Sequence, residues 1–273
     1  MLAFALALCA WPACGPAPTD DPRPTVAVSV LPQAWLVGQL AGDLVQVAVM
    51  IPPGASEATY EPTMNQMRAV QRARLYVKVG HPRLPFEAAW LDDLLRDAPG
   101  VEVLSGFAGV QMADDDPHPW TSPAAMAVAA DNAAAALARL LPGHADELTA
   151  RHAALRDLLA ALDSELAATL APLTGRRFFV FHPAWGYFAR QYGLRQVSIE
   201  HDHKEPSADE LAHLIELARS EGATMIVVQP HFSTQAAATV AAALDARLVE
   251  ADPLARDWDR NLRRFAALLV EGL

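Results

Sequence analysis

Cysteine is nearly absent from this sequence of 273 residues, which contains only Cys9 and Cys14. Both lie close to the N-terminus, so the rest of the chain excludes an internal disulfide and a metal site built from thiolates. A metal ion bound by that part of the chain must be held by histidine nitrogen and by aspartate or glutamate oxygen.

Basic residues are also scarce: 21 Lys and Arg stand against 32 Asp and Glu, and the formal net charge is −11. This balance argues against a nucleic-acid partner, which would attract a basic surface. It suits the binding of a cation, although a solvated acidic surface explains the same charge equally well.

The first residues, MLAFALALCAWPACG, are apolar but too few to span a bilayer, and they end in small side chains. This pattern predicts a secretory signal, although the basic start typical of such signals is missing. Two processing routes stay open: cleavage before Cys14 with attachment of a lipid, or a plain signal cut nearby. Residues 1–24 are expected to be this signal followed by a Pro-rich tether, which places the protein in the periplasm or on the cell surface.

Short apolar runs alternate with helix-like segments from Thr25 onward. Continuous apolar runs in this order favour an α/β fold whose parallel sheets are buried on both faces. The Ser122-Pro123 pair predicts the start of a helix, with serine as its cap and proline at its first position. The expected strands lie at 25–30, 44–51, 75–79, 109–112, 176–181, 195–199, 224–228 and 247–250.

No strand is expected between Pro123 and about Leu173. Within this stretch, residues 144–170 carry apolar side chains at helical spacing over about seven turns. Such a helix between two strand-rich halves predicts a rigid strut. We therefore expect two lobes, each a parallel sheet flanked by helices, which are joined by one long rigid helix. The expected bounds are 25–140 for the first lobe, 141–173 for the linking helix and 174–273 for the second lobe.

Six of the nine histidines follow the ends of expected strands, where open α/β sheets bind their ligands. They are His81, His118, His182, His201, His203 and His231. Carboxylates occupy similar positions at Glu57, Glu61 and Asp252. Taken singly, a histidine of this kind could be a surface, turn or packed core residue. Together they predict a site for zinc, manganese or iron, because imidazole and carboxylate without thiolate suit these ions. The remaining histidines fall in expected helices and are most simply solvated or packed: His144, His152 and His213.

Six segments of the sequence form a specific set: PPGASEATYEPT, DPHPWTSP, FHPAWGYFARQYGL, KEPSADEL, QPHFST and DPLARDW. Together they resemble the zinc- and manganese-binding solute-binding proteins of ABC importers, and the resemblance runs from about Thr25 to the C-terminus. It implies two α/β lobes bridged by a long rigid helix, with one divalent cation in the cleft. The ion is expected to be zinc, with manganese or iron as alternatives. The loaded protein, expected to be a monomer, would tilt only slightly and dock on a membrane permease.

The resemblance also implies four metal-binding positions, which fall on the Glu57/Ala58 pair, His118, His182 and Asp252 in this sequence. Family members commonly have a histidine where this chain has Ala58. The first ligand therefore stays open between Glu57, a water molecule and a third candidate, His81. A carboxylate ligand from Glu57 would shift selectivity toward harder ions such as manganese.

Further histidines exceed the ligand set that the resemblance implies, namely His201, His203 and His231. One of them, or His81, either completes the site or forms a second, weaker site beside it. The alternative is that HDHKEP, residues 201–206, is a solvated turn with two titrating surface histidines.

A metallohydrolase that uses the same histidines is the rival class, with an open coordination position and Glu57 as general base. The sequence contains no HExxH, no Walker A motif and no Gly-x-Ser-x-Gly elbow, and of HxHxDH it has only HDH. These absences favour capture of a metal over catalysis, so no enzyme activity is expected. An adhesin is a third reading, which no segment supports separately.

Overall fold

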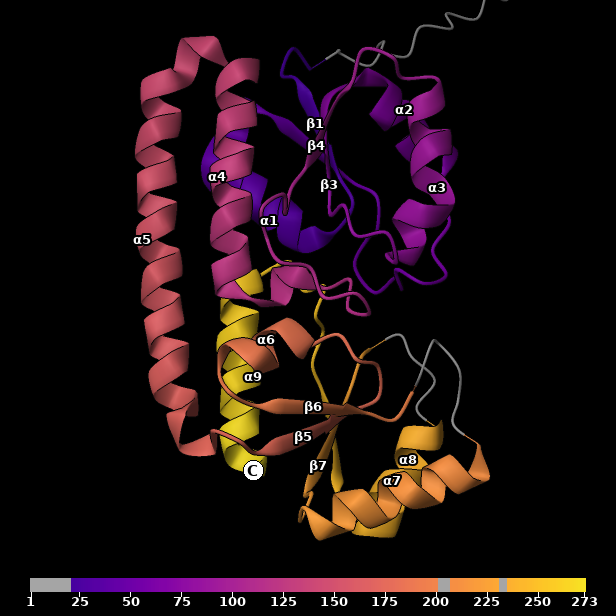
Figure 1. Ribbon diagram of the computed structural model, residues 1–273. Coiled ribbons are helices and arrows are strands. Elements are labelled where there is room, and N and C mark those ends of the chain that lie inside the picture. Colours follow the sequence, from indigo (N-terminus) through magenta and orange to yellow (C-terminus); the bar gives the residue numbers. More distant parts are fainter. Residues whose placement is uncertain (1–20, 201–206, 231–234) are drawn as a thin grey trace, which may run out of the picture.

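Two lobes make up the computed structural model, which describes residues 21–200, 207–230 and 235–273 (Figure 1). Each lobe contains a four-stranded sheet in which every pairing is parallel. A long helix, α5 (Ala145–Leu170), runs beside both lobes (Figure 1). The expected fold class is therefore confirmed.

The N-terminal lobe is built from four strands and four helices: β1 Thr25–Val28, α1 Leu31–Ala41, β2 Gln46–Val49, α2 Met64–Arg72, β3 Ala73–Lys78, α3 Pro85–Arg96, β4 Glu102–Ser105 and α4 Pro123–Leu140. Its sheet has the order β2-β1-β3-β4. The central strand β1 is buried along Val26–Val28, as its continuous apolar sequence predicts. Helices α2 and α3 cover one face, and α1 and α4 cover the other (Figure 1).

The strand predicted at 109–112 is wrong. The fourth strand is instead β4, which pairs with β3 in register from Leu75 to Lys78. Gly109 has φ 89°, a left-handed conformation that suits a turn and not a strand. β4 is an edge strand and its Val103 is 42% exposed, so it lacks the continuous apolar run of a buried strand. As a result, His118 lies in the long loop between β4 and α4 and not at a strand end.

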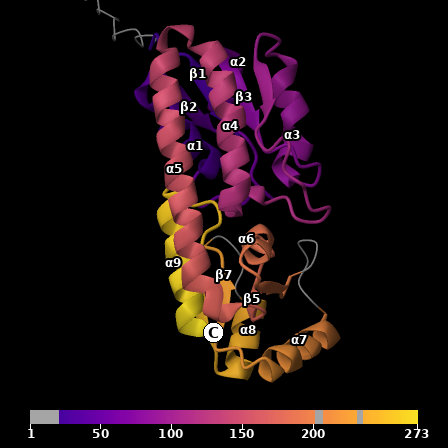
Figure 2. The same ribbon diagram turned by 60° about the vertical axis from the view of Figure 1, so that its left-hand side comes forward.

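Helices α4 and α5 form an antiparallel pair along one side of the molecule (Figures 1 and 2). α4 begins as predicted, with the Ser122 hydroxyl accepting the Ala125 N–H over 3.0 Å and Pro123 at the first position. The buried face of α5 is a row of leucines at helical spacing: Leu148, Leu155, Leu159, Leu162, Leu166 and Leu170. Within the described residues, no single helix has the length and apolarity to cross a membrane; residues 123–140 and 142–173 reach that threshold only as a pair bent by 114°.

The C-terminal lobe repeats the strand order of the first lobe, as β6-β5-β7-β8. Its elements are β5 Arg177–Val180, α6 Gly186–Gln191, β6 Arg195–Ser198, α7 Ala208–Ser220, β7 Met225–Val228, α8 Gln235–Leu244, β8 Arg247–Glu250 and α9 Trp258–Gly272. Figures 1 and 2 both show α9 running alongside α5. α7 and α8 lie at the far end of the lobe (Figure 1).

One hydrophobic core passes through both lobes. It joins the N-terminal sheet and the leucines of α5 to Phe178 in β5, Trp185 before α6, and Trp258 and Phe265 in α9. Trp185 stacks on Phe265 with ring centroids 3.8 Å apart. A second, smaller cluster lies between the other face of the C-terminal sheet and helices α7 and α8. The two lobes are thus connected by packed side chains and not by a flexible linker.

Candidate metal centre

Glu57 lies in the Pro- and Gly-rich loop between β2 and α2, yet it is only 1% exposed. The loop turns at Ser56, whose hydroxyl accepts the Ala58 N–H over 3.1 Å. Gln66, near the start of α2, fastens the loop to the sheet, because its side-chain amide donates to the Met50 carbonyl over 2.7 Å. These contacts hold the loop against the lobe with the Glu57 carboxylate inside.

His118 is oriented by an aspartate two residues earlier in the same loop. The backbone N–H and the ring Nδ1 of His118 lie 3.1 and 2.8 Å from Asp116 Oδ1. A carboxylate only accepts, so Nδ1 carries the proton and donates it. This leaves Nε2 of the buried ring to face another partner, as in the carboxylate–histidine pairs of metal sites.

His182 follows β5 in the C-terminal lobe, as the sequence predicts. The Phe181 N–H beside it continues the sheet by donating to the Val227 carbonyl over 2.8 Å. The ring Nδ1 of His182 donates to Glu200 Oε1 over 2.9 Å. Glu200 follows β6, the strand next to β5, so the parallel sheet itself brings the two side chains together.

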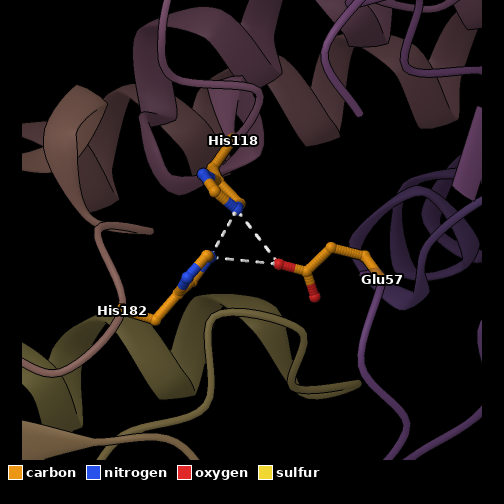
Figure 3. A group of neighbouring side chains, drawn as sticks. All are labelled: Glu57, His118 and His182. Atoms are coloured by element: carbon orange, nitrogen blue, oxygen red, sulfur yellow. Dashed lines mark hydrogen bonds and ion pairs between the residues drawn. The ribbon is translucent and has the colours of Figure 1, made fainter. Parts of the chain in front are cut away.

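The three side chains meet between the lobes (Figure 3). Glu57 Oε1 lies 3.2 Å from Nε2 of His118 and 3.3 Å from Nε2 of His182, and the two Nε2 atoms are 3.4 Å apart. Glu57 Oε2 is buried and has no hydrogen-bond partner. All three residues line a cavity of about 370 Å³. This set offers two imidazole nitrogens and one or two carboxylate oxygens to a single point.

The pKa values of the three side chains are shifted by burial and by the charges of their neighbours. Burial opposes protonation of His118, but hydrogen bonds to Asp116 and Glu57 outweigh it and raise its pKa to about 9. Burial also opposes protonation of His182, while Glu200 and Glu57 raise its pKa. Burial favours a neutral Glu57, but the two histidines hold the pKa of its carboxyl well below 4.5. The pocket therefore stabilises positive charge beside a carboxylate, and a divalent cation can take the place of the protons.

The chain is similar in sequence to known metal-binding proteins. A family model described as "Zinc-uptake complex component A periplasmic" matches residues 26–270. The chain belongs to this family. It is 29% identical to the "High-affinity zinc uptake system protein ZnuA" of Paracoccus denitrificans, over 94% of each chain. It is also 25% identical to a "Putative metal-binding protein" of Chlamydia muridarum, over 90% of each chain.

Solved structures of ZnuA have the same fold as this chain. A crystal structure of ZnuA has a TM-score of 0.88 and 36% identity, covering 92% of this chain and 99% of the other. A ZnuA deletion mutant solved with zinc bound gives a TM-score of 0.86 and 36% identity, covering 92% and 98%. The ZnuA family consists of solute-binding proteins of metal ABC transport and not of enzymes. The resemblance read from the sequence is confirmed, and the metallohydrolase reading falls away.

Within this ZnuA-type fold, His81 lies apart from the three converging residues. Its Nε2 donates to the Ala113 carbonyl over 2.7 Å, and its Nδ1 accepts the Arg83 N–H over 3.1 Å. Both ring nitrogens thus serve the backbone, and the ring is buried. In this arrangement neither ring nitrogen of His81 faces the other three side chains, so its role as a ligand stays a prediction.

Asp252 follows β8 as expected but is not one of the grouped ligands among the described residues. Its Oδ1 accepts the Leu254 N–H over 2.8 Å, and its carbonyl accepts from the side chain of Asn261 over 2.7 Å. The next residue, Pro253, is held against the His118 loop, because its carbonyl accepts the Trp120 indole N–H over 2.9 Å. The segment that carries Asp252 therefore lies beside the segment that carries His118.

Three further candidates, His201, His203 and His231, lie outside the described residues. The predictions made for them, a completed site or an auxiliary one, stay predictions.

Sequence reasoning missed the two carboxylates behind the histidines, Asp116 and Glu200. Each holds the Nδ1 of one ring and so directs its Nε2 toward the centre. The role of Asp116 could have been predicted from the local sequence, since an aspartate two residues before a histidine can accept both the backbone N–H and the ring N–H of that histidine. Glu200 could have been found from the topology, because it follows β6, the strand that pairs with β5, and His182 follows β5.

Proposed function

We propose that this ZnuA-family protein is an extracytoplasmic receptor that captures one divalent metal ion between its lobes and delivers it to the permease of an ABC importer. The observation that carries the proposal is the convergence of Glu57, His118 and His182. Their ligand atoms all lie within 4.8 Å of one another and all three side chains are buried. Two come from the N-terminal lobe and one from the C-terminal lobe, so a bound ion would join the lobes.

Zinc is the proposed cargo. Two imidazole nitrogens with a carboxylate form a donor set that zinc binds well in tetrahedral sites. The similarity to a relative named as a zinc-uptake protein and to a structure with zinc bound supports this choice. Manganese or iron is the second candidate, favoured by Glu57 Oε2, which has no partner and could supply a second, harder oxygen ligand.

Asp252 is the proposed fourth ligand. Its neighbour Pro253 is hydrogen-bonded to Trp120, which is close in sequence to His118, and this contact supports the choice of Asp252. A water molecule or one of the histidines at 201, 203 and 231 would fill the same position otherwise. A closed set of four ligands suits capture, because a catalytic zinc keeps one position open.

The remaining expectations complete the proposal. Residues 1–24 would act as signal and tether, with Cys14 as the site of a lipid anchor, and place the receptor in the periplasm or on the cell surface. The lobes at 25–140 and 174–273, with the linking helix at 141–173, would act as a monomer. The shared hydrophobic core supports a small tilt of the lobes on metal binding and not a wide closure.

Equilibrium dialysis of the metal-free protein against buffered zinc tests the proposal. We expect one tightly held zinc ion per chain at neutral pH, and competition with manganese then ranks the two ions. A parallel sample with both His118→Ala and His182→Ala should retain none. Equal retention by the two samples, or none by either, would rule out the proposed site.

A further inference from the structure

Helix α6 follows His182 in the sequence and contacts the loop that carries His118 in the other lobe. We propose that α6 positions His118 through Asp116, and that Arg190 and Gly186 are positioning residues of the metal site. This inference rests on the proposed function. It assigns a role in metal affinity to two residues that cannot themselves be ligands.

Arg190 holds the outer oxygen of Asp116. Its Nη2 donates to Asp116 Oδ2 over 3.3 Å, while Oδ1 of the same carboxylate receives His118 Nδ1 over 2.8 Å. The aspartate is therefore fixed at both oxygens, and rotation of the carboxyl would break both contacts. The guanidinium lies 4.4 Å above the ring of Tyr187, which limits where it can move.

Tyr187 fixes the start of the same loop. Its hydroxyl accepts the Ala113 N–H over 2.8 Å, and Ala113 and Asp116 pair with each other as an isolated antiparallel bridge. One turn of α6 thus holds residues 113–116 at both ends. The loop is anchored by the C-terminal lobe just before it delivers His118.

Gly186 allows this approach. A Cβ atom at position 186 would lie 2.3 Å from Asp116 Oδ2, which is closer than real Cβ contacts. The backbone of Gly186 is not in the left-handed region, so glycine is not needed there for its conformation. What glycine provides is space for the Asp116 carboxylate against the first turn of α6.

Both histidines are thus connected to the short helix α6. His182 is linked to α6 by sequence, and His118 is linked to it through Asp116. The rings stand nearly perpendicular, at 84°, with centroids 5.3 Å apart. If Asp116 lost its contact with Arg190, both histidines would still be present as ligands, but the ring of His118 would be less firmly oriented. Loss of such a partner behind a metal ligand costs about 10–100-fold in affinity.

Arg190→Ala and Gly186→Ala test the inference by two unrelated routes, one removing a contact and one adding a clash. Each should weaken zinc binding about 10–100-fold in competition with a chelator of known affinity. The Arg190 side chain is 53% exposed while its partner Asp116 is buried, so thermal unfolding of the metal-free variants measures separately what the ion pair adds to stability. Arg190→Lys, which keeps a donor, should recover part of the affinity.

Two controls match these variants. Arg190 and Arg195 line a second cavity of about 500 Å³ together with Asp116, so Arg195→Ala removes an equal charge from the surroundings of that aspartate. Gly38→Ala adds a methyl group where nothing lies within 4 Å. Both should bind zinc like wild type. Cobalt(II) bound in place of zinc supplies a readout that plain destabilisation would not move. Its visible spectrum, which reports coordination geometry, should change in the two test variants and not in the controls.

The outcomes separate this inference from the proposed function. Wild-type protein that binds no zinc would defeat the function itself. A second outcome would overturn the role of α6 alone. In that outcome the wild-type protein binds zinc tightly, and the Arg190 and Gly186 variants have the same zinc affinities and cobalt spectra as their controls. If Arg195→Ala weakens binding as much as Arg190→Ala, the effect is one of charge, and the positioning role is again refuted.

Discussion

The indole N–H of Trp258 donates a 2.7 Å hydrogen bond to the backbone carbonyl of Trp120. Trp258 opens α9 in the C-terminal lobe, whereas Trp120 lies just after His118 in the N-terminal lobe. The indole of Trp120 in turn donates to the Pro253 carbonyl over 2.9 Å, and both rings are almost fully buried. These two bonds connect the segments of His118 and Asp252 across the lobes without the help of a metal ion.

Trp258→Phe keeps an aromatic ring but removes the donor. The buried Trp120 carbonyl would then lack this partner, so the free energy of unfolding of the metal-free protein should fall by about 1–3 kcal/mol. Denaturant unfolding measures this loss. An unchanged midpoint would mean that the bond contributes nothing to holding the lobes together.

Removal of a ligand should be far more damaging than removal of a surface histidine. His118→Ala, His182→Ala and Glu57→Ala should each weaken zinc binding by more than about 100-fold, since even the loss of an outer partner costs up to that amount. His152→Ala is the matched control, because His152 is partly exposed and pairs with Asp131 on the helix surface. Isothermal titration with zinc compares them, and similar affinities in all four variants would refute the proposed ligand set.

The carboxylates behind the rings should matter although they do not touch the ion. Asp116→Asn and Glu200→Gln should each lower zinc affinity about 10–100-fold, because a neutral amide holds and polarises the imidazole less well. Asp115→Asn is the control: it changes the same charge one residue away, on an exposed side chain with no bond to His118. If Asp115→Asn lowered zinc affinity as much as Asp116→Asn, the effect would come from net charge and not from the bond to His118.

The two histidines predict opposite pH dependences with and without metal. The folded pKa of His118, about 9, lies above its usual value of 6.5, so the metal-free fold gains stability from protonation below about pH 6.5 and loses it as the pH rises toward 9. Zinc needs the neutral ring, so its affinity should rise over the same interval.

Thermal unfolding between pH 6.5 and 9 measures both trends. The melting temperature of metal-free protein should fall, and the increase produced by saturating zinc should grow. At neutral pH, zinc binding should also release protons, which titration in buffers of different ionisation enthalpy detects. A zinc-induced shift that shrinks toward pH 9 would contradict the competition between zinc and the protons on His118 and His182.

Much of the fold could be read from local pattern. The apolar runs of β1, β5 and β7, the leucine spacing of α5 and the Ser122-Pro123 start of α4 each record burial or capping in a few residues. β4 could not be read in this way, because an edge strand is half-exposed and its pairing with β3 involves residues far away in the sequence. The apolar run at 109–112 favoured a strand, whereas Gly109 adopts a left-handed conformation and forms a turn.

The candidate site was predictable where chain topology decides it and not where tertiary contacts do. His182 follows a central strand, so its place at the sheet edge was evident. His81 fits the same rule, yet its nitrogens are taken by the backbone of a neighbouring loop, which the sequence does not display. The grip of α6 on Asp116 depends on two lobes packing together, and so only the structure reveals it.

Diffraction from crystals grown with zinc, with anomalous data at the zinc edge, tests the metal site most directly. We expect one strong peak between the lobes, about 2.0–2.2 Å from Nε2 of His118, Nε2 of His182 and a carboxylate oxygen of Glu57. Asp252, a water molecule or one of the histidines at 201, 203 and 231 should supply the remaining contact. A fully occupied peak elsewhere, with the three side chains still hydrogen-bonded to one another, would contradict the proposed capture of metal at this centre.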